Sequence, residues 1–199
     1  MAARFEGVPV VEFLPDGRNI ELKSELTFYD SEEIRWSVPP KAVVDGASIP
    51  SAFWSLIGSP LTGRYRDASI IHDWFCDQRT RTWEATHRVF YEAMIVSGVT
   101  LARAKLMYFA VRWAGPRWEE RVSINTNLDV GERYRFEEIG ANVSPPRTRR
   151  KIGVQSPGEV MSEDGQRRVA EAVAAHMENE EPSIERIEEL AELPSPLVS

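Results

Sequence analysis

Residues 44–54 read V-D-G-A-S-I-P-S-A-F-W, and residues 66–77 read R-D-A-S-I-I-H-D-W-F-C-D. These segments open a longer region, residues 44–115, which holds two of the three histidines, the only cysteine and four of the six tryptophans. Side chains that can bind metals or transfer protons therefore concentrate in a part of the chain that is also rich in large apolar residues. We expect the fold to be built around this region and any functional site to lie within it.

Apolar residues in this region recur at three- and four-residue spacing, which is the pattern of amphipathic helices. The spacing predicts a short helix through residues 53–57 and longer helices over about residues 64–78, 82–97 and 100–115. Thr82 and Thr100 stand at the expected N-terminal caps, and Gly98 follows the end of the second long helix. Because the connections are short, neighbouring helices should be antiparallel.

The segment before this region alternates apolar and polar residues, as half-buried strands do. Pro15-Asp16-Gly17 predicts a turn, and the alternation that resumes at Ile20 slips near Ser24. Pro39-Pro40 ends the pattern, because proline cannot donate a hydrogen bond to a neighbouring strand. We therefore predict an α+β fold, with a small antiparallel β-meander over residues 8–38 packed on a three- to four-helix core.

The composition changes after residue 139, and the prediction divides the chain there. Residues 1–139 are expected to form a globular α+β domain, and residues 140–199 a C-terminal extension. The extension begins with a basic cluster, Arg147 to Lys151, which we interpret as a solvated linker. Apolar spacing then predicts a helix over residues 166–179 and a last short helix after Pro182-Ser183. With few large apolar residues, the extension is expected to pack on its own domain or on a neighbour.

Composition and charge argue against several classes of protein. The formal net charge of -7 is opposite to that of a protein that binds nucleic acid by neutralising phosphates. The single cysteine, Cys76, cannot form an internal disulfide. The first residues lack the apolar stretch of a signal peptide, and no run approaches the ~20 apolar residues of a membrane span.

Four residues are the candidates for a functional site. His72 and Asp73 are neighbours on the first long helix, so their side chains should point about 100° apart. His87 lies on the next helix, and Asp45 lies in the loop before the helices. Cys76, one turn after His72, is interpreted as a small core residue rather than a nucleophile.

Three interpretations of these residues stay open. In the first, Asp45, His72, Asp73 and His87 bind a divalent metal such as zinc, iron or manganese. In the second, His72 is a general base oriented by a carboxylate, and Asp73 binds a cation or the substrate. In the third, His72 and Asp73 belong to a buried hydrogen-bond network that ties the Asp45 loop to the helices.

Several short motifs, taken in order, resemble a known family. They are Asp45-Gly46-Ala47-Ser48-Ile49-Pro50, His72-Asp73-Trp74, Phe90-Tyr91-Glu92-Ala93-Met94 and Met107-Tyr108. Over about residues 5–116 the chain resembles the domain of unknown function numbered 1353, a family associated mainly with tailed bacteriophages and prophages. The chain departs from the family pattern at Gly46, where the family has an aromatic residue, near Cys76, where it has a tyrosine, and near His87, where it has an acidic residue.

The resemblance implies a phage context, and two functions follow from it as expectations. The first is a virion-associated structural or assembly protein of the tail, baseplate or head, in the virion or in the host cytoplasm during assembly. Its partners would be other phage structural proteins, reached through residues 140–199, or further copies of the chain itself. The alternative is a metal-assisted hydrolase of the cell envelope, with His72 and Asp73 as catalytic residues and Asp45 and His87 as further metal ligands.

Overall fold

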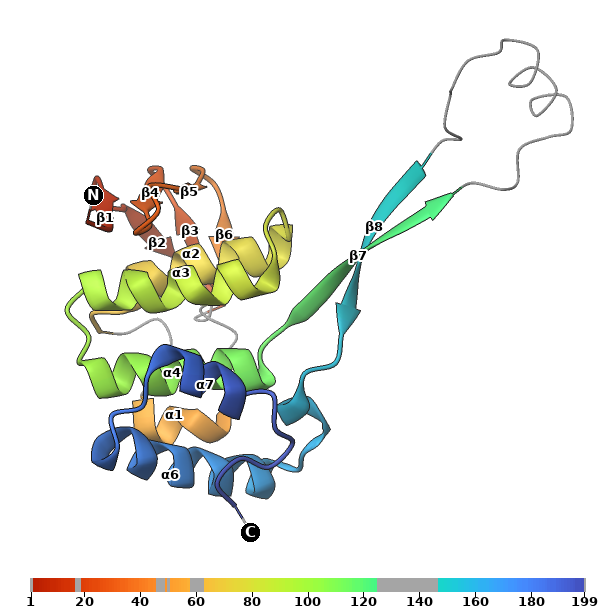
Figure 1. Cartoon of the computed structure of the whole chain (residues 1–199). Coiled ribbons are helices and arrows are strands. Elements are labelled where there is room, and N and C mark those ends of the chain that lie inside the picture. The colour runs from red at the N-terminus through yellow and green to blue at the C-terminus, as the bar shows by residue number, and fades with distance from the viewer. Residues whose placement is uncertain are drawn as a thin grey trace, which may run out of the picture. The chain divides into compact units, whose positions relative to one another are not determined.

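The chain folds into two compact units in a computed structural model (Figure 1). The structure describes residues 2–16, 19–45, 49, 51–57, 63–124 and 147–198. The larger unit combines Met1–Arg117 with Gln155–Ser199, and the smaller unit is Trp118–Val154. The N-terminal and C-terminal parts of the chain therefore share one unit, although a separate segment lies between them in the sequence.

The strands of the larger unit form two small antiparallel sheets. One sheet has the order β1-β4-β5, built from Arg4–Glu6, Leu26–Tyr29 and Arg35–Val38. The other has the order β2-β3-β6, built from Val11–Phe13, Ile20–Leu22 and Val43–Val44. The predicted α+β class is confirmed, but six short strands in two sheets replace the single meander of about three strands.

The break between the two sheets lies where the alternation of apolar residues slips. Strand β3 ends at Leu22 and β4 begins at Leu26, so the residues between them carry the chain from one sheet to the other. Ser24 fixes this crossing, because its hydroxyl accepts a hydrogen bond of 2.9 Å from the backbone nitrogen of Val10. Since strand side chains alternate with period two, the slip turns each half of the segment toward its own sheet.

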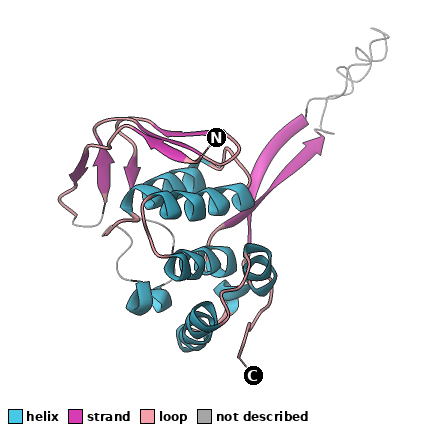
Figure 2. Ribbon diagram, turned by 60° about the vertical axis from the view of Figure 1, so that its left-hand side comes forward, coloured by secondary structure: helices cyan, strands magenta, loops and turns pink. Residues whose placement is uncertain are grey.

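The predicted helices are present with nearly the predicted bounds (Figure 2). They are α1 (Ser51–Ile57), α2 (Arg66–Gln78), α3 (Trp83–Val96) and α4 (Leu101–Ala114). Thr82 caps α3 as expected, since its side chain accepts a hydrogen bond from Ala85 N. The predicted capping turn of α1 involves residues 46–48 and 50, which lie outside the described residues. No helix in the described ranges is both long enough and apolar enough to cross a membrane.

Helix α4 is the centre of the larger unit (Figure 1). The sheets pack on α2 and α3, α3 packs on α4, and the other face of α4 packs on α1 and on the C-terminal helices. Residues 104–113 of α4 are therefore all buried, including Tyr108, Phe109 and Trp113 with no exposed surface. A helix covered on several sides needs apolar residues all round, which explains its weak amphipathic pattern.

The C-terminal segment packs on this helical core rather than standing apart from it. It contains a short 3-10 helix, Pro157–Val160, followed by α6 (Glu163–Asn179) and α7 (Ile184–Leu190). Val169, Val173 and Met177 form the buried stripe of α6, which packs on α1 and α4. Gly158 lies so close to α4 that an added Cβ would be 2.5 Å from the Cβ of Ala114.

This arrangement differs from the predicted division of the chain. The prediction placed residues 140–199 in one extension, whereas the structure groups residues 155–199 with residues 1–117. The physical reason is the apolar stripe of α6, which is too narrow for an independent core but sufficient to cover one side of an existing core. The predicted boundary itself, at residues 139 and 140, lies outside the described residues.

The smaller unit contains a two-stranded sheet. Its strands are β7 (Arg117–Ile124) and β8 (Arg147–Val154). The basic cluster interpreted as a linker therefore forms the start of a strand, which is a correction to the prediction. The turn predicted at Asn125-Thr126-Asn127, and the strand residues predicted at Tyr134, Phe136 and Ile139, lie outside the described residues.

Candidate functional site

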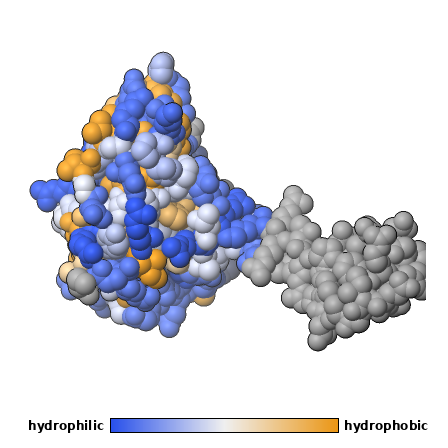
Figure 3. All heavy atoms as spheres, turned by 90° about the horizontal axis from the view of Figure 1, so that it is seen from above, coloured by the Kyte–Doolittle hydropathy of each residue, from blue (hydrophilic) through white to orange (hydrophobic). Residues whose placement is uncertain are grey.

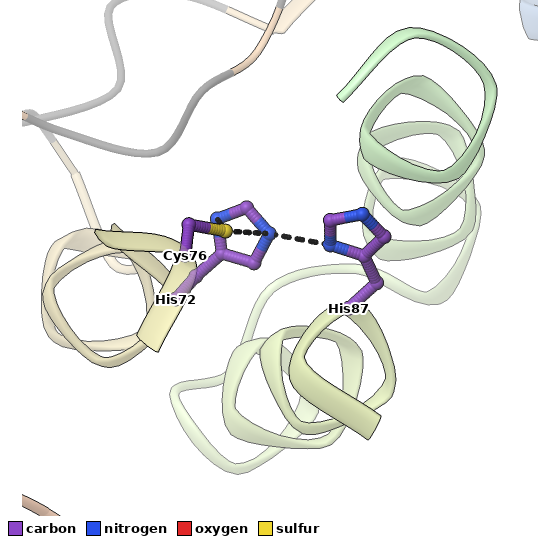
Figure 4. A group of neighbouring side chains, drawn as sticks. All are labelled: His72, Cys76 and His87. Carbon is purple, nitrogen blue, oxygen red and sulfur yellow. Dashed lines mark hydrogen bonds between the residues drawn. The ribbon is translucent and has the colours of Figure 1, made fainter. Parts of the chain in front are cut away.

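Two of the predicted site residues, His72 and His87, meet between α2 and α3. Figure 4 shows the two imidazole rings pointing toward one another from neighbouring helices. His72 Nε2 and His87 Nδ1 are 2.8 Å apart and share a hydrogen bond. Neither histidine has any exposed surface. The α2–α3 interface therefore contains a polar contact that is closed off from solvent.

Cys76 joins this pair from the same helix as His72. Its Sγ lies 3.6 Å from His72 Nε2 and 3.8 Å from His72 Nδ1, and the residue is 4% exposed. One ligand atom from each of His72, Cys76 and His87 lies within 4.8 Å of the others. We refer to these three residues as the His–Cys–His cluster.

Burial keeps both histidines neutral at ordinary pH. Desolvation lowers the pKa of His72 to about 3. Desolvation also lowers the pKa of His87 well below its usual value, helped by the charges of His72, Arg112 and Arg117, while the Pro116 backbone offsets this only in part. Burial raises the pKa of the Cys76 thiol, and nearby aspartates add to this effect. The cluster thus consists of two neutral imidazoles and a neutral thiol, and its shared hydrogen bond uses one proton.

One nitrogen of the cluster is left unsatisfied. His87 Nε2 is buried and has no hydrogen-bond partner of normal geometry within the described part of the chain. Whichever histidine donates the shared proton, this atom keeps either an unused N–H or an unused lone pair. An unpaired buried polar atom costs about 1–3 kcal/mol, and a hydrogen bond from His87 to the Pro116 backbone, which raises the pKa of His87, offsets part of this cost.

Aromatic and cationic side chains surround the cluster. The ring of Phe90 lies 4.7 Å from that of His72, and the ring of Trp83 lies 5.5 Å from that of His87. The guanidinium groups of Arg112 and Arg117 lie 4.8 and 4.4 Å from the Trp83 ring centre. Trp83 thus contacts His87 and both buried cations, and the charges of the cations contribute to the lowered pKa of His87.

Asp73 and Asp45 form a second polar group on α2. The Oδ2 atom of Asp73 accepts a hydrogen bond of 2.9 Å from the backbone nitrogen of Asp45. Asp73 is 4% exposed, while Asp45 is partly exposed. Burial, together with the charges of Asp45 and Asp77, raises the pKa of Asp73 to about 7, although its hydrogen bond from Asp45 N opposes the shift.

The structure therefore sorts the four predicted site residues into two groups. His72 and His87 are in contact, and Asp45 and Asp73 are in contact with each other instead. The prediction did not include Cys76 among the metal ligands. Its position one turn after His72 is a signal that could have placed it there, since residues four apart share a helix face.

One distance in the cluster equals that expected in a zinc site. Zinc holds imidazole nitrogen at about 2.0–2.1 Å and thiolate sulfur at about 2.3 Å, so tetrahedral ligands lie about 3.3 Å (N to N) and about 3.6 Å (S to N) apart. The separation of Cys76 Sγ from His72 Nε2, 3.6 Å, matches this value. The 2.8 Å between the two histidines is shorter, as expected for nitrogens joined by a proton rather than by a metal.

Comparison with known proteins identifies the central part of the chain. Residues 20–111 match the family described as "Protein of unknown function (DUF1353)". This segment therefore belongs to that family, as the sequence motifs predicted, and it includes both α2 and α3 with the whole His–Cys–His cluster.

Two relatives from Sinorhizobium fredii share this region. "Uncharacterized protein y4jT" is 47% identical over 126 residues, which are 62% of this chain and 38% of the relative. "Uncharacterized protein y4iH" is 40% identical over 109 residues, which are 55% of this chain and 46% of the relative. The match covers less than half the length of each relative. No solved structure matches the chain significantly.

Proposed function

We propose that the His–Cys–His cluster binds a divalent metal of the zinc class, which braces the helical core of a non-catalytic assembly protein. The observation that carries this proposal is the meeting of two imidazoles and a thiol from two helices in an almost fully buried site. Imidazole and thiolate together suit zinc better than they suit magnesium or calcium, which prefer oxygen.

Metal binding would change the protonation of the cluster. The metal would take the place of the proton shared by His72 Nε2 and His87 Nδ1, and Cys76 would bind as the thiolate. His87 would then carry its proton on Nε2, its other ring nitrogen. Three protein ligands leave a fourth position for water or another group.

Burial favours a structural role for this cluster over a catalytic one. A general base must reach the substrate, whereas His72 has no exposed surface. A histidine with a pKa of about 3 is also a weak base near neutral pH. The cluster instead connects α2 to α3, the two helices that support both sheets.

Two surface features support an assembly role. A two-stranded ribbon is marginally stable alone in water, and the β7–β8 unit is one. The edge strand β2 and the segment before it carry exposed apolar side chains, with Phe13 of the strand 62% exposed and Val8 before it 82% exposed. Figure 3 shows hydrophobic areas on an otherwise largely hydrophilic face. Such features are what a neighbouring subunit covers, and the phage context that the sequence resemblance implies makes a virion the first assembly to test.

Elemental analysis of the purified protein tests the metal. We expect close to one metal ion per chain in the wild type, and loss of the metal in the Cys76→Ser and His87→Gln variants. The matched control is His176→Gln, which changes the third histidine, on α6 and outside the cluster. Metal that is absent from the wild type, or retained by both cluster variants, would contradict the proposal.

The second candidate function is that of a hydrolase in which Asp73, rather than His72, is the catalytic acid or base. A carboxylic acid with a pKa of about 7 beside a second carboxylate is suited to general acid–base catalysis. In this case Asp73→Asn would abolish turnover of a cell-envelope substrate without unfolding the protein. Equal activity in the wild type and in Asp73→Asn would exclude this role.

A further inference from the structure

The hinge before the last helix, residues 180–183, is held in an unfavourable conformation. Glu181 has a φ of 44°, in the left-handed region, although it is not a glycine. It also precedes Pro182, and a residue before proline prefers an extended backbone. Both effects favour opening of the hinge, which would carry α7 away from α6.

Helix α7 docks through a small and well-defined set of contacts. Ile187 and Leu190 are buried, at 0% and 1% exposure, against the core. Glu188 accepts a hydrogen bond of 2.5 Å from the Tyr108 hydroxyl. After the helix, the backbone carbonyl of Leu193 accepts a hydrogen bond of 3.0 Å from Trp113 Nε1.

Ion pairs fix the orientation of this segment. Arg117 holds Glu192 in a two-point contact, with N–O distances of 2.8 and 3.1 Å. Arg112 lies 3.6 Å from the same carboxylate, and both arginine side chains are only 9% exposed. We call Tyr108, Arg112, Trp113 and Arg117 the α7 cradle. Removal of the acidic segment would leave two buried cations without their partners, so an open cradle strongly favours recapture of such a segment.

A second copy of the chain offers a matching occupant. Every copy carries the same acidic segment and the same basic cradle, so exchange between two chains recreates each contact and gives a closed, symmetric dimer. A short hinge under strain is the condition that promotes such exchange, because the swapped form keeps the contacts and relieves the hinge.

We infer that α7 of one chain docks in the α7 cradle of a second copy, so that the protein self-associates by exchange of its C-terminal segment. This inference extends the assembly role proposed above and names a partner for it. It does not depend on the His–Cys–His cluster, so absence of metal would leave it unaffected.

A pair of charge-reversed chains tests the exchange. Arg117→Glu places two carboxylates together within one chain, and Glu192→Arg places two guanidinium groups together. Exchange between the two variants restores a complementary pair in both cradles. We expect the mixture, measured by native mass spectrometry, to form a heterodimer that neither variant forms as a homodimer. The double variant, with both changes in one chain, is the control and should behave as the wild type does. A mixture that stays monomeric while both variants are folded would overturn the inference.

Changes in the hinge provide an independent test. Glu181→Gly removes the strain of a positive φ at a residue with a side chain, so the unexchanged monomer becomes more stable relative to the dimer. The dissociation constant of the dimer should therefore rise at least about tenfold, because each dimer contains two hinges. The matched control is Lys41→Gly, which removes the same kind of strain at another residue with a positive φ, 71°, away from the hinge. This control should leave the dissociation constant unchanged.

If the charge-reversed variants do not fold, deletion of residues 180 and 181 decides the question. We expect a dimer, since α7 can no longer reach its own cradle, and a folded monomer would overturn the inference.

Discussion

Helix α2 carries residues of two polar groups that differ in burial and in the direction of their pKa shifts. The His–Cys–His cluster lies between α2 and α3, is almost fully buried and is neutral because charging an imidazole there is costly. The Asp45–Asp73 pair lies toward the partly exposed Asp45 loop, and burial raises the pKa of its Asp73 carboxyl to about 7. His72 and Asp73 are adjacent in sequence, yet the helical rotation of about 100° assigns them to different sites.

This comparison teaches that one dipeptide can serve two physical purposes. The histidine contributes a metal ligand or a buried hydrogen bond between helices, and the aspartate anchors a loop. Substitution of His72 and substitution of Asp73 should therefore have different effects on stability, and these effects should depend differently on metal and on pH.

The largest effect is expected for His72→Ala in metal-free protein. The change opens a cavity and removes the hydrogen-bond partner of His87 Nδ1, so the free energy of unfolding should fall by about 2–4 kcal/mol. Denaturant unfolding measures this value, with His176→Ala as the control that should change it by less than about 0.5 kcal/mol. An equal loss in both variants would show that the buried cluster has no special role.

The second effect is the pH dependence of the stability of the metal-free wild type. The histidine pair and Asp73 change the free energy of unfolding in opposite directions as the pH rises. The pKa of His72 is about 3 in the folded protein and 6.5 ordinarily, so its stabilising contribution is complete above pH 6.5 and is lost as the pH falls toward 3. His87 acts in the same direction. The pKa of Asp73 rises from 3.8 to about 7, so its contribution is complete below pH 3.8 and is lost as the pH rises to 7.

Between about pH 4 and pH 6, the two histidines change the free energy of unfolding more steeply than the one aspartate does in the opposite direction. We expect the free energy of unfolding to rise from pH 4 to pH 6, at most by about 1.4 kcal/mol per pH unit. Denaturant unfolding at several pH values measures the slope. A fall of stability over this range would show that the aspartate, and not the histidine pair, dominates.

Asp73→Asn separates the two contributions and has the third largest effect. An asparagine oxygen can still accept the hydrogen bond from Asp45 N but has no charge to desolvate. The variant should be more stable than the wild type at pH 8, by about 1–2 kcal/mol, and equally stable near pH 4. Metal content should not change. A variant that is less stable at both pH values would show that the carboxyl group itself is required.

The smallest effect is expected for Ser69→Ala, one turn before Asp73. The Ser69 hydroxyl is buried and, within the described residues, has no hydrogen-bond partner. Its removal should leave the free energy of unfolding unchanged or raise it by up to about 1 kcal/mol, as thermal unfolding would show. A clear loss of stability would reveal that this hydroxyl belongs to one of the two groups.

Local patterns predicted the helices because each helix contains its own signals. Thr82 and Ser183 cap α3 and α7 as the sequence indicated, and the apolar spacing placed α2 to within two residues of its start. The pairing of strands was less accessible, since it depends on contacts between distant residues. The slip at Ser24 was visible in the sequence, but its consequence, a change of sheet, was not.

The candidate site shows the same limit. The sequence identified His72 and His87, but which side chains meet depends on how α2 and α3 are rotated against each other. That rotation follows from the packing of whole helix faces, which also determined that Cys76 joins the histidines and that Asp73 does not. Docking of α7 was equally hidden, because Arg117 and Glu192 are 75 residues apart.

The most direct test of the metal centre is a thermal unfolding curve with added zinc and with a chelator, for the wild type and for Cys76→Ser. We predict that zinc raises the melting temperature of the wild type and that the chelator reverses the rise, because binding to the folded state alone adds about 4 kcal/mol at a free concentration one thousand times the dissociation constant. Cys76→Ser should melt at one temperature under both conditions. A wild type that is insensitive to zinc and chelator would contradict the account and would leave the two histidines as a buried hydrogen bond between helices.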